Sequence, residues 1–348
     1  MPSLNIPTID PTSIFEHFRG NYGSELLTAA VEHFGLFQHL ADSPLNEDAL
    51  RIQLGLEPRP FIVLTTALKA MRLIESDGSR RLQLSPLARE HLVPGGPFYI
   101  GDYVALAANS PGVLEIVKRL RANRPAHAEE SDTGAAFIFR EGLDSAMEME
   151  ASARRLTLAL AGRAKNVAPV MADRVSFGNE TLLDIGGGTG IYAIACLKRH
   201  PGLRAIVFDR PEVLKVAREF AAEYGVADRL ECQPGDMFAD PLPAADVILL
   251  SNILHDWDVP ECSNLVSRCT DALKSGGRLL IHDVFLNDDL DGPLPVALYS
   301  ASLFTLTEGR AYSAQEYRDW LHAAGLVTSV VEPTLIHCGV LTGRKRTR

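Results

Sequence analysis

One histidine occupies a position from which it could take a proton from a reacting group. His255 lies in the run SNILHDWD, just after the apolar stretch Ala245–Leu250. A neutral imidazole, with an ordinary pKa of about 6.5, can accept a proton at neutral pH as a weakly acidic hydroxyl attacks. The alternative is a structural histidine that caps the following helix. We interpret the neighbouring acids Asp256 and Asp258 as helix-capping and dipole residues rather than catalysts.

A glycine-rich run marks a second candidate site. Asp184–Gly190 reads DIGGGTG and joins an apolar stretch to a predicted helix. Glycine lets the backbone turn sharply and lets a ligand approach it closely. The dinucleotide pattern G-x-G-x-x-G, started at Gly186, needs a glycine at the position where this chain has Ile191. The spacing therefore favours a nucleoside that carries an amino acid over a pyrophosphate, and a plain tight turn is the alternative.

Two acids follow the next two predicted strands. Asp209 ends the second strand, and Asp236, in the run GDMF, follows the third. A carboxylate at the first of these places can accept hydrogen bonds from both ribose hydroxyls. Asp236 can accept from an adenine amino group, with Met237 or Phe238 against the ring. Because ligands of open α/β sheets bind at the carboxyl ends of the strands, these residues predict one nucleoside site.

The elements that must position these residues alternate after residue 180. The predicted strands are Thr181–Ile185, Ala205–Phe208, Leu230–Gln233, Ala245–Leu250 and Arg278–His282, and the predicted helices are Ile191–His200, Pro211–Tyr224 and Cys262–Leu273. This alternation predicts an α/β fold with a doubly wound, mostly parallel, Rossmann-like sheet. Val327–Glu332 and Thr334–Leu341, separated by Pro333, predict a final antiparallel pair at the sheet edge.

The residues before 180 are predicted to be mostly helical. The predicted helices are Ser24–Leu40, Arg59–Glu75, Leu87–His91, Gly101–Ala122 and Leu143–Asp173. A turn at Asp77-Gly78 and alternating residues at Arg80–Leu84 add a short hairpin, and helices followed by a hairpin indicate a winged helix. We expect a winged-helix-like domain at 1–100, a helical linker and substrate-pocket segment at 101–175, and a cofactor-binding domain at 176–348.

Composition and charge restrict the partners of the chain. Its 348 residues include 34 Lys and Arg against 44 Asp and Glu, so the formal net charge is −10 and phosphate backbones repel it. No apolar run reaches the roughly 18 residues of a membrane span, and the N-terminus lacks the features of a signal peptide. The five cysteines form no C-x-x-C pair. We therefore expect a cytoplasmic protein with buried free thiols, no bound metal, and neither nucleic acid nor membrane as a partner.

The motifs resemble those of the S-adenosylmethionine-dependent O-methyltransferases that act on small molecules. The GGGTG loop, Asp209, the run GDMF at Gly235–Phe238 and the run LHDWD at Leu254–Asp258 carry the resemblance. The nearest groups are the caffeic acid and acetylserotonin O-methyltransferases and bacterial enzymes that methylate aromatic natural products. The resemblance covers nearly the whole chain. It implies S-adenosylmethionine as cofactor, a small aromatic methyl acceptor, and a homodimer formed through the N-terminal domain.

The resemblance assigns cofactor-binding roles to residues of the C-terminal half. The predicted set is Asp184, Gly186, Gly188, Asp209, Arg210, Gly235, Asp236, Met237, Phe238, Ser251 and Trp257. Trp257 matches a tryptophan that flanks the adenine, and a core aromatic residue is the alternative. Ser251 stands where many relatives have a lysine at the adenine end, and its shorter, uncharged side chain weakens that contact.

The resemblance also implies that His255 is the general base and that Asp283 orients it. Relatives often place two acids around the histidine, one just after the fifth strand, where Asp283 stands, and one in a stretch like G-[KR]-E-R-T. The matching stretch here, Gly309–Ser313, reads GRAYS, so Ala311 replaces the glutamate. A catalytic histidine needs a partner that fixes its tautomer. We therefore expect Asp283 alone to orient His255, with Tyr312 adding a hydroxyl at the rim of the pocket.

Other functions remain open at this stage. One is methylation of carbon in a keto acid or another activated acceptor, and some relatives of that kind use a metal, which a His255–His282 pair could hold. A second is a methyltransferase-like protein that binds the cofactor but performs other chemistry. A third is a DNA-binding regulator, which the winged helix suggests and the acidic charge balance opposes. The sequence does not identify the methyl acceptor.

Overall fold

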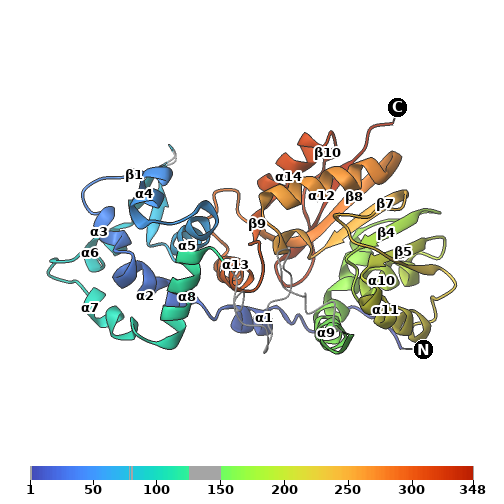
Figure 1. The fold of residues 1–348 in the computed structure, drawn as a ribbon, viewed down its shortest axis with the longest axis horizontal. Coiled ribbons are helices and arrows are strands. Elements are labelled where there is room, and N and C mark those ends of the chain that lie inside the picture. The colour runs from blue at the N-terminus through green and yellow to red at the C-terminus, as the bar shows by residue number, and fades with distance from the viewer. Residues whose placement is uncertain (1, 78, 80, 125–149, 348) are drawn as a thin grey trace. The chain divides into compact units, whose positions relative to one another are not determined.

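The computed structural model describes residues 2–77, 79, 81–124 and 150–347. These residues form two compact units (Figure 1). Of the described residues, unit 1 contains 2–15, 150–285 and 314–347, and unit 2 contains the remainder, which lies within 16–124 and 286–313. The units therefore interleave along the chain, and their boundaries differ from those of the three consecutive domains predicted from the sequence.

Unit 1 is built around a sheet with the strand order β10-β12-β8-β7-β4-β5-β6. Its strands are β4 (Thr181–Ile185), β5 (Arg204–Asp209), β6 (Leu230–Pro234), β7 (Ala245–Ser251), β8 (Leu273–Leu286), β10 (Val327–Thr328), β11 (Glu332–Pro333) and β12 (Cys338–Arg344). Neighbouring strands from β6 to β8 run parallel, and β12 pairs antiparallel with β8. The predicted α/β fold with a mostly parallel, Rossmann-like sheet is confirmed.

The antiparallel edge of this sheet has other boundaries than we predicted. The expected strand over 334–341 is wrong in its first half, because β12 begins only at Cys338. Ile336 and His337 have φ angles of 61° and 58°, a left-handed conformation that interrupts an extended strand. The expected strand over 327–332 is reduced to the short strands β10 and β11, both of which pair with β12.

Helices cover both faces of the sheet (Figure 1). They are α9 (Glu150–Arg174), α10 (Ile191–Arg199), α11 (Pro211–Glu223), α12 (Val259–Ala272) and α14 (Ala314–Ala323). Helices α9, α10 and α11 lie on one face, and α12 and α14 lie on the other. Met171 and Ala172 of α9 are buried in one core with Leu182 and Leu249 of the sheet. Part of the expected linker segment therefore belongs to unit 1.

Unit 2 is mostly helical and contains a small antiparallel sheet of order β1-β3-β2. Its elements include α2 (Gly23–Thr28), the π-helical turn η1 (Ala29–His33), α3 (Leu36–His39), β1 (Leu45–Asn46), α4 (Glu47–Leu54), α5 (Pro58–Ala70), β2 (Ile74–Ser76), β3 (Arg81–Leu84), α6 (Pro86–His91), α7 (Gly101–Val104), the 3₁₀ turn η2 (Ala105–Ala107), α8 (Pro111–Ala122), α13 (Leu294–Leu306) and β9 (Tyr312–Ser313). Helix α1 (Thr12–Arg19) spans the first boundary between the units. Helix α5 followed by the β2–β3 hairpin agrees with the predicted helix and hairpin, whereas helix α4 was not predicted.

Three helices of this unit are shorter or more divided than predicted. Gly35, with a φ of 54°, separates η1 from α3 inside the expected helix 24–40. Arg72, with a φ of 60°, follows the end of α5, so the predicted helix 59–75 is too long. The expected helix 101–122 is divided, and Pro111 begins its last segment, α8. Proline is favoured in the first turn of a helix because it has no N–H to leave unsatisfied.

Helix α13 brings a segment from near the C-terminus into unit 2. Leu298 and Phe304 of this helix are buried in one core with the apolar residues of α5. Arg59, at the start of α5, donates a hydrogen bond to the carbonyl oxygen of Thr307 at 3.2 Å. This bond satisfies a backbone acceptor just beyond the end of α13. We had expected the segment in the C-terminal domain, but its apolar side chains complete the core of unit 2.

Two further expectations concern membranes and thiols. Over the described ranges, no helix combines the length and the apolar character needed to cross a bilayer. All five cysteines are free thiols, and Cys232 is half-buried whereas the other four are buried. The prediction of free thiols is confirmed, and the prediction that all are buried is wrong for Cys232, which lies in the edge strand β6.

Candidate active site

The loop after β4 has a backbone conformation that favours glycine. Gly186, Gly188 and Gly190 have φ angles of 64°, 59° and 70°, in the left-handed region where other residues are strained. A Cβ added to Gly186 would lie 2.5 Å from the side chain of Ile253, whereas one added to Gly188 would have no atom within 4 Å. The loop thus presents its backbone to open space at Gly188, which suits the close approach of a ligand.

Asp209, at the end of β5, holds this loop in place. Its Oδ2 accepts a hydrogen bond from the Gly188 N–H at 2.9 Å, and its Oδ1 accepts from the Arg210 N–H at 2.7 Å. Burial raises the pKa of Asp209, although these two N–H groups and the Arg210 guanidinium oppose the rise. The structure therefore brings three of the predicted cofactor residues into one hydrogen-bonded group.

Asp184 is a fully buried carboxyl group at the start of the glycine loop. Among the described residues, neither of its side-chain oxygens has a hydrogen-bond partner. Burial raises the pKa of Asp184 to about 7; the Ala193 backbone opposes this rise and the Asp209 carboxylate adds to it. A buried carboxylate is costly unless a donor or a cation meets it. The position therefore fits a ligand that carries positive charge.

Asp236 organises the turn that follows β6. Its Oδ1 accepts a hydrogen bond from the Phe238 N–H at 2.7 Å, and its Oδ2 lies 3.7 Å from the Arg210 guanidinium. The ring of Phe238 meets the ring of Trp257 edge to face, with 4.7 Å between the centroids. Met237 lies in the same turn, and its carbonyl oxygen accepts a hydrogen bond from a nearby arginine. These residues form one polar and aromatic group beside the glycine loop.

The last two predicted cofactor residues have structural contacts of their own. A Cβ added to Gly235 would lie 2.2 Å from the ring of Phe208, so packing alone requires glycine there. The hydroxyl of Ser251 forms a hydrogen bond with Nδ1 of His282 at 2.9 Å. These contacts account for the residue types without a cofactor. The binding roles of Gly235 and Ser251 therefore stay predictions.

His255 and Asp283 form a buried pair, although Asp283 lies inside β8 and not just after this strand as predicted. His255 lies in the 3₁₀ turn η3 (Leu254–Asp256) after β7, and Asp283 lies in β8. Nδ1 of His255 is 2.5 Å from Oδ1 of Asp283, and the side chains are 5% and 1% exposed. Burial acts to raise the pKa of Asp283, but the imidazole lowers it overall. The two residues predicted as a catalytic pair are thus in direct contact.

Sequence reasoning missed two residues beside this pair. Tyr317 of α14 donates a hydrogen bond from its hydroxyl to Oδ2 of Asp283 at 3.1 Å. Asp256 has its Oδ1 3.6 Å from Nε2 of His255, and burial raises its pKa to about 6. The interpretation of Asp256 as a helix cap is wrong, because Asp258 is the N-cap of α12. Its place next to His255 in the sequence was the available signal, whereas no pattern marked Tyr317.

The stretch in which a glutamate is missing belongs to unit 2. Ala311 and Tyr312 are fully buried there, and the Arg310 guanidinium lies 4.3 Å from the centroid of the Tyr312 ring. The suggestion that the Tyr312 hydroxyl stands at the rim of the pocket stays a prediction. A different tyrosine, Tyr317, supplies a hydroxyl to Asp283 within unit 1.

The geometry does not favour a metal held by His255 and His282. Nδ1 of His282 bonds to the Ser251 hydroxyl, and Nε2 lies 3.2 Å from the hydroxyl of Thr334. Burial lowers the pKa of His282 to about 3, so the ring is neutral. Within the part of the chain that the structure describes, no three His, Cys, Asp or Glu side chains are grouped as metal ligands.

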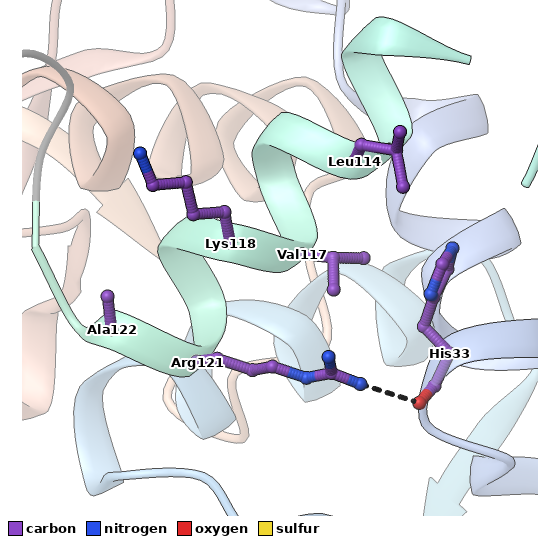
Figure 2. Close-up of a pocket in the computed structure, with 6 residues that line it drawn as sticks. All are labelled: His33, Leu114, Val117, Lys118, Arg121 and Ala122. Atoms are coloured by element: carbon purple, nitrogen blue, oxygen red, sulfur yellow. Dashed lines mark hydrogen bonds between the residues drawn. The ribbon is translucent and has the colours of Figure 1, made fainter. Parts of the chain in front are cut away.

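A shallow pocket of about 540 Å³ lies in unit 2 (Figure 2). It is lined by His33, Leu114, Val117, Lys118, Arg121 and Ala122, and Arg121 donates to the carbonyl oxygen of His33 at 3.3 Å. Most of the lining comes from α8, which is part of the expected substrate-pocket segment. Residues 125–149 of that segment lie outside the described residues. None of the predicted catalytic or cofactor residues lines this pocket.

Curated proteins that resemble this chain include O-methyltransferases of bacterial and animal origin. Residues 163–327 match the O-methyltransferase domain. The chain is 36% identical over 326 residues to the 3-hydroxy-5-methyl-1-naphthoate 3-O-methyltransferase of Streptomyces sahachiroi, covering 90% of this chain and 89% of that protein. It is 32% identical over 324 residues to the acetylserotonin O-methyltransferase of Bos taurus, covering 89% and 90%.

Two solved structures that resemble this chain are also methyltransferases. An O-methyltransferase family 2 protein from Planctomyces limnophilus, in complex with apigenin, superposes with a TM-score of 0.88 at 47% identity and covers 98% of each chain. Human N-acetylserotonin methyltransferase, in complex with S-adenosylmethionine, superposes with a TM-score of 0.61 at 25% identity over 100% of both chains.

The fold and the site together define an S-adenosylmethionine-dependent methyltransferase. More narrowly, the chain belongs to the O-methyltransferase family. S-adenosylmethionine is its cofactor. The unpartnered carboxylate of Asp184 and the open backbone at Gly188 fit this group, because the cofactor carries both an ammonium and a sulfonium cation.

The buried Asp184 should make the protein without cofactor less stable as pH rises. Its pKa is about 7 in the folded chain against an ordinary value of 3.8, so between these values the folded state holds a proton that the unfolded chain has lost. Above pH 7 the cost reaches about 4 kcal/mol. We expect Asp184→Asn to raise the melting temperature at pH 8 by roughly 5 °C and to change it much less at pH 5. Thermal melting without cofactor measures both values.

The exposed Asp228 offers a matched control, and Asp228→Asn should melt like the unsubstituted protein at both pH values. A gain for Asp184→Asn that is equal at pH 5 and pH 8 would mean that the carboxyl group does not titrate in this range. Calorimetry should also show weaker binding of S-adenosylmethionine to Asp184→Asn, since the amide cannot meet a cation as a carboxylate does.

Proposed function

We propose that this O-methyltransferase methylates a hydroxyl group of a small aromatic molecule, with His255 as the general base. The hydrogen bond of 2.5 Å between Nδ1 of His255 and Oδ1 of Asp283 carries the proposal. The names of similar proteins support an aromatic acceptor, since one methylates a hydroxynaphthoate and another was solved with apigenin. Most phenols ionise near pH 10, so at neutral pH such an acceptor needs help to lose its proton.

The cofactor site supplies an activated methyl group. S-adenosylmethionine, when bound, carries this methyl on a sulfonium, from which an acceptor oxygen can displace it in line. We assign the cationic end of the cofactor to the surroundings of Asp184 and the ribose to Asp209. Asp236, Phe238 and Trp257 would hold the adenine. Holding two reactants in line can lower a barrier by as much as proton transfer does.

The contact with Asp283 fixes the role of each imidazole nitrogen. Nδ1 donates its hydrogen to Asp283 Oδ1, so Nε2 is the nitrogen that accepts the proton of the acceptor hydroxyl. Asp283 is itself held by the Val284 N–H at 2.8 Å and by the Tyr317 hydroxyl at 3.1 Å. With these two donors, the carboxylate cannot rotate without losing hydrogen bonds. The ring of His255 is thereby oriented although Ala311 replaces the glutamate of relatives.

The charges around His255 set the pH range in which it can act. Burial acts to lower the pKa of His255, but Asp283 and Asp256 outweigh this effect, so the pKa lies above its ordinary value. The imidazole is a base only when it is neutral. Methyl transfer should therefore speed up as pH rises through this elevated pKa and level off above it.

We also propose that unit 2 contains a winged-helix-like domain through which two chains associate. Large apolar side chains of this unit are exposed, although each is costly to leave in water. They include Phe18, Ile52, Leu87, Phe98, Ile100, Tyr103, Leu106 and Leu114. Tyr103 and Leu106, on neighbouring turns, are 78% and 80% exposed. A second copy of the chain would remove this surface from water.

Incubation with methyl-labelled S-adenosylmethionine and a panel of phenols, hydroxyindoles and keto acids tests the proposed reaction. Label should pass to the hydroxyl oxygen of one or more phenols or hydroxyindoles, and product analysis should place the methyl on oxygen. Label found only on the carbon of keto acids would replace the proposal with carbon methylation. Cofactor binding without transfer to any acceptor would favour a binding protein with other chemistry.

Substitution of the catalytic pair should give non-additive losses. His255→Ala should reduce kcat by at least about 10²-fold with unchanged cofactor affinity, because general-base catalysis typically contributes that much. Asp283→Asn should reduce kcat nearly as far, and the double variant should be little worse than either, since residues that act as one unit do not add. Steady-state kinetics on the accepted phenol measures the three rates.

His200→Ala serves as the control, because this half-buried histidine bonds the backbone carbonyl of Ala172 and contacts the ring of Phe177, neither of which belongs to the proposed site. It should leave kcat within about twofold of the unsubstituted value. Full activity in His255→Ala would exclude the general-base role. Near-normal turnover in Asp283→Asn would show that another group orients the imidazole.

Association of two chains should be visible in solution. An obligate interface of this kind buries upward of about 2,000 Å², so the dimer should persist at micromolar concentration. Sedimentation equilibrium should give twice the chain mass of 37.9 kDa. Replacing Tyr103 and Leu106 with Glu should shift the mass toward one chain if these residues lie in the interface. A single-chain mass for the unsubstituted protein at that concentration would contradict the proposal.

A further inference from the structure

Arg163 joins helix α9 to the segment that carries the proposed base. Its Nη2 donates a hydrogen bond to Oδ1 of Asn252 at 2.6 Å and lies 3.2 Å from Sγ of Cys338. Asn252 is the first residue after β7 and stands three positions before His255. No pattern in the sequence linked Arg163 to this segment, because α9 lies almost ninety residues earlier in the chain.

Asn252 is an unusual residue in this segment. Its φ angle is 58°, a left-handed conformation that asparagine tolerates better than most residues do. Its backbone N–H donates to the carbonyl oxygen of His282 at 2.8 Å. Its side-chain nitrogen donates to the hydroxyl of Ser251 at 3.0 Å and to that of Tyr192 at 3.3 Å. The amide oxygen is therefore the group that the arginine holds, and the whole amide is fixed in one orientation.

This segment leads directly from the strand to the catalytic turn. From Asn252 the backbone passes through Ile253 into η3, which contains His255. The hydrogen bonds of Asn252 to β8 and α10, together with its bond to Arg163, set where the turn begins. Nδ1 of His255 and Oδ1 of Asp283 are 2.5 Å apart. A shift of the turn would move the imidazole away from this hydrogen-bonded position.

Arg163 also contributes to the charge balance around the imidazole. Among the described residues of unit 1, charged groups that act on His255 include Asp256 of its own turn, Asp283 of β8 and Arg163 of α9. Tyr317 of α14 donates a hydrogen bond to Asp283, the partner of the imidazole. The two carboxylates favour the protonated imidazole, whereas the guanidinium lowers the pKa of His255 and opposes that proton.

We propose that Arg163 is a positioning residue for methyl transfer, which fixes the Asn252–His255 segment through its hydrogen bond to Asn252 and adds a positive charge to the surroundings of the imidazole. The proposal rests on the proposed role of His255 as general base. Arg163 need not touch the acceptor or the reacting methyl group to act in this way. Its hydrogen bond and its charge make separate contributions, and two substitutions distinguish them.

The test is the pH dependence of kcat at saturating cofactor and acceptor for Arg163→Gln and Arg163→Lys. Loss of the positive charge in Arg163→Gln should raise the pH at which the rate rises by roughly 0.5–1 unit, so activity at pH 7 falls several-fold while the plateau is reached at higher pH. Arg163→Lys keeps the charge but not the planar donor group. Its midpoint should stay in place, and its plateau should fall.

Arg199→Gln is the matched control. Arg199, the last residue of α10, forms an exposed ion pair at 3.1 Å with Asp173, which lies near the C-terminal end of α9. Loss of this ion pair should move neither the midpoint nor the plateau. Calorimetry with S-adenosylmethionine and thermal melting on each variant establish folding and cofactor affinity. If Arg163→Gln does not fold, Arg163→Lys still tests the proposal. An unmoved midpoint with a lower plateau supports it, and a shifted midpoint or an unchanged plateau contradicts it.

The proposal is overturned if the midpoint does not move in Arg163→Gln. It is also overturned if the midpoint shifts equally in the lysine and glutamine variants. A large loss of cofactor affinity with an unmoved midpoint overturns it as well, because Arg163 would then be a cofactor contact. His255→Ala in the same assay separates the two hypotheses. Full activity in that variant refutes the general base, whereas an inactive His255→Ala with an unmoved Arg163→Gln profile refutes only the role of Arg163.

Discussion

The burial of carboxylates in the carboxyl-terminal halves of parallel strands is the constraint on which the site depends. Asp184 is the penultimate residue of β4, Asp209 is the last residue of β5, and Asp283 lies inside β8. A carboxylate removed from water must be compensated. Backbone N–H groups compensate Asp209, and the imidazole of His255 compensates Asp283. Asp184 has no such partner among the described residues. Asp209 thus holds the glycine loop, and we propose that Asp283 orients the base and that Asp184 lies near the cationic end of the cofactor.

Much of this arrangement was predictable because it follows from local sequence and from one topological rule. The apolar strands and the residues that follow them predicted His255 and Asp209, because parallel strands place their carboxyl ends along one edge. The role of Asp283 was predicted from the resemblance to the methyltransferase family, and this residue lies inside β8 rather than after it. Gly186 and Gly188 have left-handed φ angles, which favour glycine, so the residue type itself indicates this local conformation. Such features need no knowledge of distant contacts.

The parts that sequence reasoning missed are those created by distant contacts. Tyr317 reaches Asp283 from a helix 34 positions later, and Arg163 reaches Asn252 from a helix 89 positions earlier. Nothing in either helix distinguishes these side chains from neighbours that face water. Asp256 was interpreted as a helix cap because an acid before a helix usually caps it, but the next acid, Asp258, is the N-cap here.

The inclusion of α13 in unit 2 has a consequence for biosynthesis. A ribosome releases the chain from its N-terminus, and domains generally fold as units in that order. Unit 2 cannot follow this order, because Leu298 and Phe304 complete its core and are made only after most of unit 1. Until α13 has been synthesised, part of the apolar surface of the early helices of unit 2 stays exposed to water. A polypeptide cut short before residue 294 would expose that surface permanently and become a substrate for chaperones and proteases.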